Sequence, residues 1–129
     1  MFLIHAVEGG HIPAFEYLPA GAITPKVGMA MVQSGGVLAM ASGEAAPAYI
    51  SMLESAQALE EGELMPVIRV TPEIVFETEA SVSIASVKLG DKLTIATDGM
   101  RVTATTGGAA EVVAVDGTEA GSKVRVRFA

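Results

Sequence analysis

Short segments that alternate apolar and polar residues between glycines dominate the last third of the chain. Residues 90–95 and 121–126 share one pattern: a glycine, two polar residues, and then apolar residues at every second position. A period of two bounded by turn residues is typical of half-buried strands in an antiparallel sheet. We therefore expect residues 87–128 to form a β-meander, in which each strand pairs with the next one along the chain.

The first two thirds of the chain also consist of short apolar segments separated by turns. The segments that we expect to be strands lie at residues 2–7, 15–19, 29–32, 37–41, 48–53, 63–70 and 73–79. Gly35-Gly36 and Gly107-Gly108 lack the spacing of a phosphate-binding loop, and we interpret both pairs as hairpin turns. With the last third, this gives about ten short strands at the spacing of a sandwich or barrel. The sequence therefore predicts an all-β fold.

Two segments leave the local structure open. In residues 51–62, Ser51 and Glu54 match a helix capping box and Gly62 suits a helix end; the alternative is a strand that ends near Glu54, followed by an acidic loop. Pro66 has no N–H to donate to a neighbouring strand, so we expect its strand to lie at a sheet edge or to contain a bulge.

Length and charge limit the class of protein. A chain of 129 residues can bury a sizeable core, and it has no cysteine for disulfides or thiolate metal sites. The formal net charge of −7 argues against a general nucleic-acid binder, which needs clustered Lys and Arg. Residues 1–79 hold two basic and ten acidic residues, whereas residues 80–129 hold six and five. This asymmetry can place opposite charges on surfaces that meet between copies or on a partner.

The sequence predicts no contact with a membrane. No apolar run approaches the roughly 20 residues that cross a bilayer. The first residues have no basic region and do not resemble a signal peptide, so we expect synthesis in the cytosol.

No group of residues predicts a catalytic, metal or cofactor site. His5 and His11 are the only histidines, and even with Glu8 they leave a tetrahedral metal site incomplete. Glu77 and Glu79 are expected to share one face of a strand, as paired acids in an enzyme do, but the other groups that catalysis needs are missing. We interpret this pair as solvated or interface charge.

The apolar segment at residues 2–7 has two possible roles. A terminal strand is stable only when it joins a sheet, so this one either completes the domain's own sheet or adds to the edge of a neighbouring molecule. We favour the second role. The chain is then divided into an N-terminal arm, residues 1–14, and a single β domain, residues 15–129.

Several pieces occur in a familiar order: the arm, then Leu18-Pro-Ala-Gly-Ala-Ile-Thr-Pro-Lys-Val-Gly-Met-Ala, a Gly-x-Lys-Leu/Val strand, Asp-Gly turns and a closing Gly121-Ser-Lys-Val-Arg-Val-Arg-Phe. This order resembles small head decoration, or capsid-cement, proteins of tailed phages and prophages. The resemblance covers about residues 15–128. It is a pattern of turns and strands and contains no catalytic signature.

The resemblance implies a small β-barrel or β-tulip-like domain with an extended N-terminal arm. It also implies a structural, non-enzymatic protein of the virion, made in the host cytoplasm, that forms a homotrimer on the capsid exterior and bridges subunits of the major capsid protein. The arm is the usual contact element in such proteins, which places the partner interface at Phe2, Ile4, His5, Val7, His11 and Ile12. Deleting residues 1–10 is then expected to leave the domain folded but to weaken its binding to the particle.

A second hypothesis is a bacterial β-barrel domain that binds a small molecule or assists an enzyme. Such a domain needs a concave pocket with convergent polar groups. The sequence has four Phe, two Tyr and no Trp, and no aromatic cluster that would line such a pocket. A deep pocket in a monomer favours this hypothesis, whereas a symmetric oligomer favours decoration.

Overall fold

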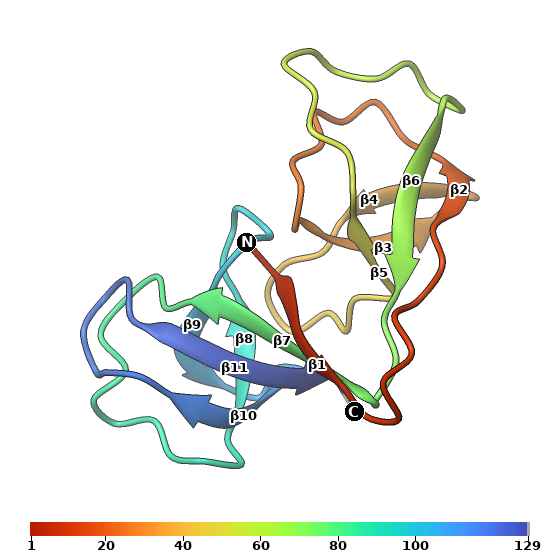
Figure 1. Ribbon diagram of the computed structural model, residues 1–129. Coiled ribbons are helices and arrows are strands. Elements are labelled where there is room, and N and C mark those ends of the chain that lie inside the picture. Colours follow the sequence, from red (N-terminus) through yellow and green to blue (C-terminus); the bar gives the residue numbers. More distant parts are fainter. Residues whose placement is uncertain (129) are drawn as a thin grey trace.

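The computed structural model describes residues 1–128, which form eleven β-strands and no helix. The strands make up two antiparallel sheets that form two adjoining lobes (Figure 1). Their bounds are β1 (Leu3–Val7), β2 (Glu16–Pro19), β3 (Ala30–Ser34), β4 (Val37–Met40), β5 (Tyr49–Ser51), β6 (Leu64–Arg69), β7 (Ile74–Glu79), β8 (Lys92–Ile95), β9 (Val102–Thr106), β10 (Ala110–Val115) and β11 (Lys123–Phe128). The prediction of an all-β fold is confirmed.

The two sheets have the same strand order once β1 is set aside. The five-stranded sheet runs β2-β6-β5-β3-β4, and the six-stranded sheet runs β1-β7-β11-β10-β8-β9. Strands β2 to β6 therefore correspond in order to β7 to β11. Neither sheet closes into a barrel. In each, however, the residue after β2 or β7 forms a parallel bridge with the strand at the far edge of the same sheet, Ala20 with Leu38 of β4 and Ala80 with Val102 of β9. The chain thus forms one five-stranded topology twice.

Backbone hydrogen bonds repeat along with the topology. The carbonyl of Ala20 accepts a bond from Gly62 N–H (2.7 Å), and the carbonyl of its counterpart Ala80 accepts one from Gly121 N–H (2.8 Å). Both glycines have a left-handed backbone, with φ of 90° and 88°, which other residues rarely adopt. The two halves are therefore equivalent in backbone geometry at the turns that fix the sheet.

The core lies inside each lobe and continues between them. The five-stranded sheet encloses a smaller cluster that includes Met31, Leu38 and Met65. The larger cluster fills the six-stranded sheet and also takes in Ala30, Ile50 and Ile68 of the first sheet. Residues from both sheets therefore share one core, and the two lobes pack as one body.

The N-terminal strand joins the chain's own sheet. β1 pairs antiparallel with β7, from Leu3 opposite Glu77 to Val7 opposite Ile74. Phe2, just before it, is fully buried, and its ring meets that of Phe128 edge-on at 5.6 Å between centroids. Of the two roles considered for this segment, the structure shows the first. Because residues 1–10 include a core side chain, their deletion is not a neutral change for folding.

No helix forms in residues 51–62. β5 ends at Ser51, and residues 52–63 are irregular, as the alternative to the helix required. The two side chains of the supposed capping box have other partners. Ser51 Oγ accepts a bond from Leu53 N–H (3.2 Å), and Glu54 Oε1 accepts one from Val27 N–H (3.1 Å).

The expectation that Pro66 marks an edge strand or a bulge is wrong. Its strand, β6, lies between β2 and β5 with a regular register on both sides. The pairs of β5 with β6 end at Ser51 opposite Val67, so the Pro66 nitrogen faces a position just beyond the end of β5. At that position Met52 N–H donates to the Pro66 carbonyl (3.0 Å), so residue 66 needs no N–H of its own.

The predicted β-meander is also wrong, because β10 pairs with β8 and not with β9. Gly107 and Gly108 therefore do not form a hairpin turn but carry the chain across β8. Gly108 N–H donates to Lys92 O (3.2 Å), and a Cβ at residue 108 would clash with the backbone carbonyl of Leu93. Close passage over a backbone requires glycine as much as a tight turn does. The pair Gly35-Gly36 does form the predicted hairpin, between β3 and β4.

Candidate functional site

The candidate features for a functional site in the described residues are surface features. No pocket forms in residues 1–128, and the same residues contain no group of three or more His, Asp or Glu side chains arranged to hold a metal ion. They also contain no helix long and apolar enough to cross a membrane. The surface offers two features: charged pairs on the six-stranded sheet and an apolar strip on the five-stranded sheet.

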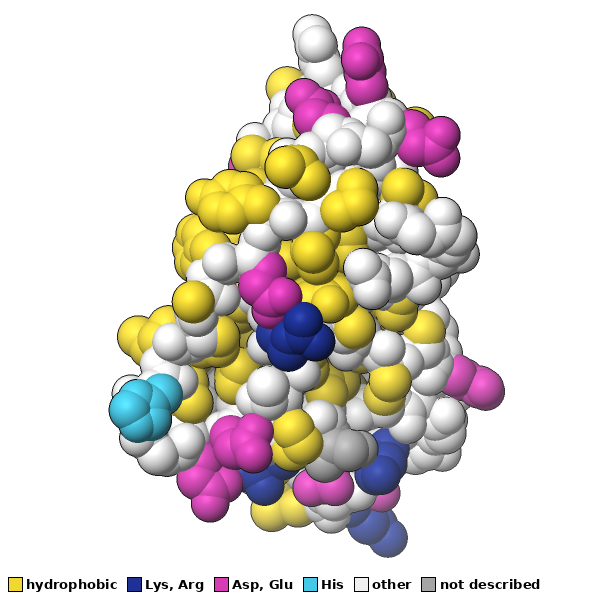
Figure 2. Space-filling model, turned by 90° about the vertical axis from the view of Figure 1, so that its right-hand side faces the viewer, with side chains coloured by type: hydrophobic (Ala, Val, Ile, Leu, Met, Phe, Trp, Pro, Cys, Tyr) yellow, Lys and Arg dark blue, Asp and Glu magenta, His cyan; other side chains and the backbone are white. Residues whose placement is uncertain are grey.

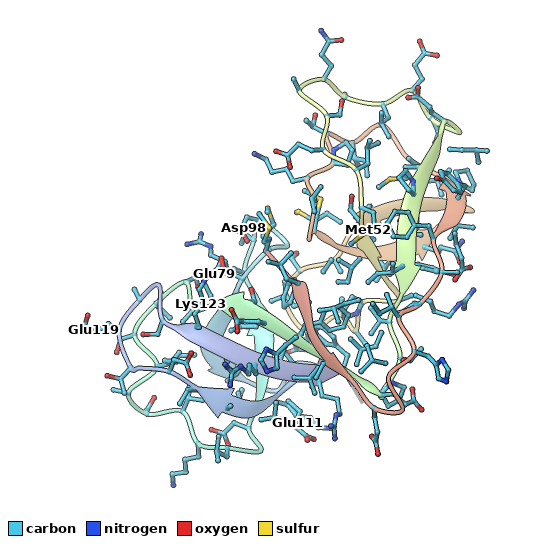
Figure 3. All side chains as sticks on the ribbon, in the orientation of Figure 1. Met52, Glu79, Asp98, Glu111, Glu119 and Lys123 are labelled. Carbon is cyan, nitrogen blue, oxygen red and sulfur yellow. The ribbon has the colours of Figure 1, made fainter. Side chains whose placement is uncertain are left out.

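The charged pairs lie on the outer face of β7 and β11. Glu77 and Glu79 share that face, as predicted, and each faces a basic residue of β11. Glu77 Oε2 lies 3.4 Å from Arg125 Nε and 3.7 Å from His5 Nδ1. Glu79 Oε2 lies 3.4 Å from Lys123 Nζ, and the two side chains adjoin in Figure 3. All are partly exposed, and such pairs contribute less than about 1 kcal/mol to stability.

Asp98 orders the turn of the second lobe that meets the first (Figure 3). Burial opposes its ionisation, but bonds from Met100 N–H (2.9 Å) and Arg101 Nε (2.8 Å) outweigh this and lower the pKa of Asp98. In the same turn, Gly99 O accepts a bond from Ala30 N–H (2.8 Å). The ionised carboxylate therefore stabilises a contact between lobes, which is a structural role.

The five-stranded sheet has an apolar outer face where β2 and β6 pair. Leu18 packs on the inner core, so its neighbours on either side in β2 point outward. Tyr17 stands opposite Pro66, and Pro19 opposite Leu64, and paired residues share a face. We call these four residues, with Phe15, the apolar strip.

Three of the five side chains of the strip are strongly exposed, and Pro19 and Pro66 are half-buried. Tyr17 and Leu64 are both 62% exposed, and Phe15 is 54% exposed. Figure 2 views the molecule from the side on which β2 and β6 lie, and hydrophobic side chains gather over the upper part of that face. Clustered exposed apolar residues are typical of protein-interaction surfaces, whereas single ones are common everywhere.

One ion pair borders the strip. The Arg69 guanidinium donates to both carboxylate oxygens of Glu16, at 3.0 and 2.9 Å, and lies 5.2 Å from the ring centre of Tyr49. The bond to Glu16 raises the pKa of Arg69, so the arginine stays charged. The one basic side chain of β2 and β6 is thereby neutralised.

The interface residues expected in the arm fall into two groups. Phe2 is buried, and Ile4 and Val7 pack against the core, so these three contact the chain's own sheet. His5, His11 and Ile12 are exposed, Ile12 to 77%.

The apolar strip was missed from the sequence. Its signal was present, because Phe15 and Tyr17 are two residues apart in a segment predicted as extended, and so are expected on the face opposite to Leu18. An exposed face cannot be told from a buried one by alternation alone.

Comparison of the chain with protein-family models, with curated proteins and with solved structures found no match.

Proposed function

We propose that this protein binds the outside of an assembled phage capsid and stabilises the shell by bridging capsid subunits, as a head decoration protein. The proposal begins from the resemblance in turns and strands, and the apolar strip is the observation that carries it further. A structural protein of this kind needs an outer surface that binds another protein, and the strip provides one on an otherwise acidic lobe.

The proposed mechanism is stabilisation by mass action. A protein that binds the assembled shell and not free subunits favours assembly, and many identical weak contacts on one particle add through avidity. We propose a β-tulip-like fold for the domain. We also propose a homotrimer as the bound unit, which places three copies of the strip against neighbouring capsid subunits.

The test uses empty shells assembled from the major capsid protein of the phage or prophage that encodes this chain. The purified protein should co-sediment with these shells at a saturable ratio and raise the temperature at which they break. Light scattering should give a mass of three times 13.2 kDa. Absence of binding to the shells at micromolar concentrations would refute the proposal.

Two surface variants locate the contact. Burying an exposed Tyr or Leu side chain contributes about 1.5–3 kcal/mol, so Tyr17→Ser and Leu64→Ser should each weaken shell binding about tenfold or more. Leu89→Ser is the matched control, because Leu89 is 68% exposed but lies before β8 in the other lobe. Equal affinity for all three variants would place the contact elsewhere.

A further inference from the structure

The repeated topology leaves one strand position filled in one lobe and open in the other. In the six-stranded sheet, the outer edge of β7 is covered by β1. Its counterpart β2 pairs with β6 on one side, and no described strand pairs with it along the other. Just after their C-terminal ends, β2 and β7 each meet the last strand of their sheet through a parallel bridge, Ala20–Leu38 and Ala80–Val102 respectively. The open position therefore lies before Ala20.

The backbone of β2 presents the same groups as β7 does. Ala20 N–H donates to Glu63 O (2.8 Å), next to β6, while Gly21 N–H donates to Leu38 O (2.9 Å), on the opposite side. Backbone groups of successive strand residues point to opposite sides, so the even residues of β2 bond to β6. Tyr17 therefore directs its N–H and C=O groups toward the open edge, and Phe15, which immediately precedes β2, is the next residue of the same parity.

Strand β7 shows how such an edge is used. Ala80 N–H donates to Ser122 O (3.0 Å), toward β11, so the odd residues of β7 face β1. Glu73 O, at the start of this edge, accepts a bond from Glu8 N–H (2.8 Å). Offset by sixty residues, Glu73 corresponds to Pro13, which lacks an N–H but keeps the carbonyl that this bond needs.

We propose that the open edge of β2 at Tyr17, together with residues 13–15 just before β2, binds an extended strand of the capsid subunit, antiparallel to β2, as β1 binds β7. The inference rests on the proposed function for the identity of the partner. Addition of a strand to an exposed edge is a common mode of peptide recognition, with affinity from main-chain bonds and specificity from alternate side chains. Pro19 has no N–H for the open side, and Gly21 N–H is already used, so the added strand has about the length of β1.

Charge and exposure define the partner's chemistry. Residues 1–79 hold two basic and ten acidic residues, and the Arg69 beside this edge is paired with Glu16. A second copy, presenting the same acidic lobe, is therefore a poor occupant. The favoured partner strand is neutral or basic, with apolar residues at alternate positions that continue the apolar strip.

Hydrogen exchange of the full chain, free and bound to shells, tests the arrangement amide by amide. When about 99% of the protein is bound, exchange of the Phe15 and Tyr17 amides should slow about 100-fold. The amides of Glu16 and Leu18 already bond to β6, so they should be unchanged and serve as internal controls. Shell binding with no slowing at residues 15 and 17 would overturn the inference alone. Failure to bind shells at all would overturn both this inference and the proposed function.

A proline variant separates main-chain pairing from contact of the side chain. Tyr17→Pro and Tyr17→Ser both remove the ring, but only the proline removes the outward N–H, and proline is tolerated on an edge strand. Tyr17→Pro should bind shells at least about tenfold more weakly than Tyr17→Ser. Equal affinity of two folded variants would refute strand addition, and if Tyr17→Pro does not fold, the exchange pattern of the unmodified chain decides.

Discussion

Replacing Phe2 with alanine tests whether the start of the chain belongs to the core or to an interface. Phe2 is fully buried against Phe128, and removing a buried phenyl ring costs about 3–5 kcal/mol. The lower value applies here, because the residue is next to the chain end and its surroundings can relax. A loss of about 3 kcal/mol is a large part of the 5–15 kcal/mol typical of a domain.

The assay is urea unfolding followed by far-ultraviolet circular dichroism. With a slope of about 2 kcal/mol/M, Phe2→Ala should lower the midpoint by about 1.5 M. Leu3→Ala is the matched control, because Leu3 is next in sequence but 47% exposed, and it should change stability by less than about 0.5 kcal/mol. If both variants unfold at the same midpoint, Phe2 is not a core residue and the argument from its burial fails.

Three further predictions concern the fold. Gly108→Ala should destabilise by about 1–3 kcal/mol, because its Cβ would meet the β8 backbone; an unchanged melting temperature would disprove that close passage. Asp98 has a lowered pKa in the fold, so the stability it contributes is present above its ordinary pKa of 3.8 and is lost as the pH falls through the folded value. Asp98→Asn should therefore make the free energy of unfolding fall less steeply below about pH 4. Parallel plots of unfolding free energy against pH for the two proteins would exclude this role. Glu16→Gln should leave the midpoint of urea unfolding almost unchanged despite the two short bonds to Arg69, because the pair is exposed and screened by solvent; a clear fall in the midpoint would contradict this.

The strands were predictable because their residues alternate, but their order was not. Alternation reports which residues share a face and says nothing of the neighbouring strand. It therefore predicts a hairpin at Gly107-Gly108, whereas β10 pairs with β8 and not with β9. The prediction of an edge or a bulge at Pro66 failed for a similar reason, since the missing N–H matters only where a partner strand extends opposite residue 66.

The repeat of topology was hidden because its halves share mainly turn residues. Lys26-Val27-Gly28 and Lys88-Leu89-Gly90 occupy equivalent turns, in which each glycine donates to the strand beyond it, Gly28 to Ser51 and Gly90 to Val112. Between such turns, core positions differ, as Leu18 and Thr78 do. Burial requires only that a side chain fit the space, so the same strand order and backbone hydrogen bonds can form from two halves with little common sequence. Predicting the apolar strip required the same knowledge of strand order, namely which lobe lacks a strand along its outer edge.

The contact between Phe2 and Phe128 joins two residues that lie far apart in the order of synthesis. At about 5–20 residues per second, Phe2 is made roughly 6–25 s before Phe128. The strand that follows Phe2, β1, is made before β7, the strand with which it pairs. The strands of the first lobe, residues 16–69, are all made before β7 begins. An apolar strand without its partner is a template for mispairing, so a nascent chain has to keep β1 away from the open edge of β2 until β7 has been made.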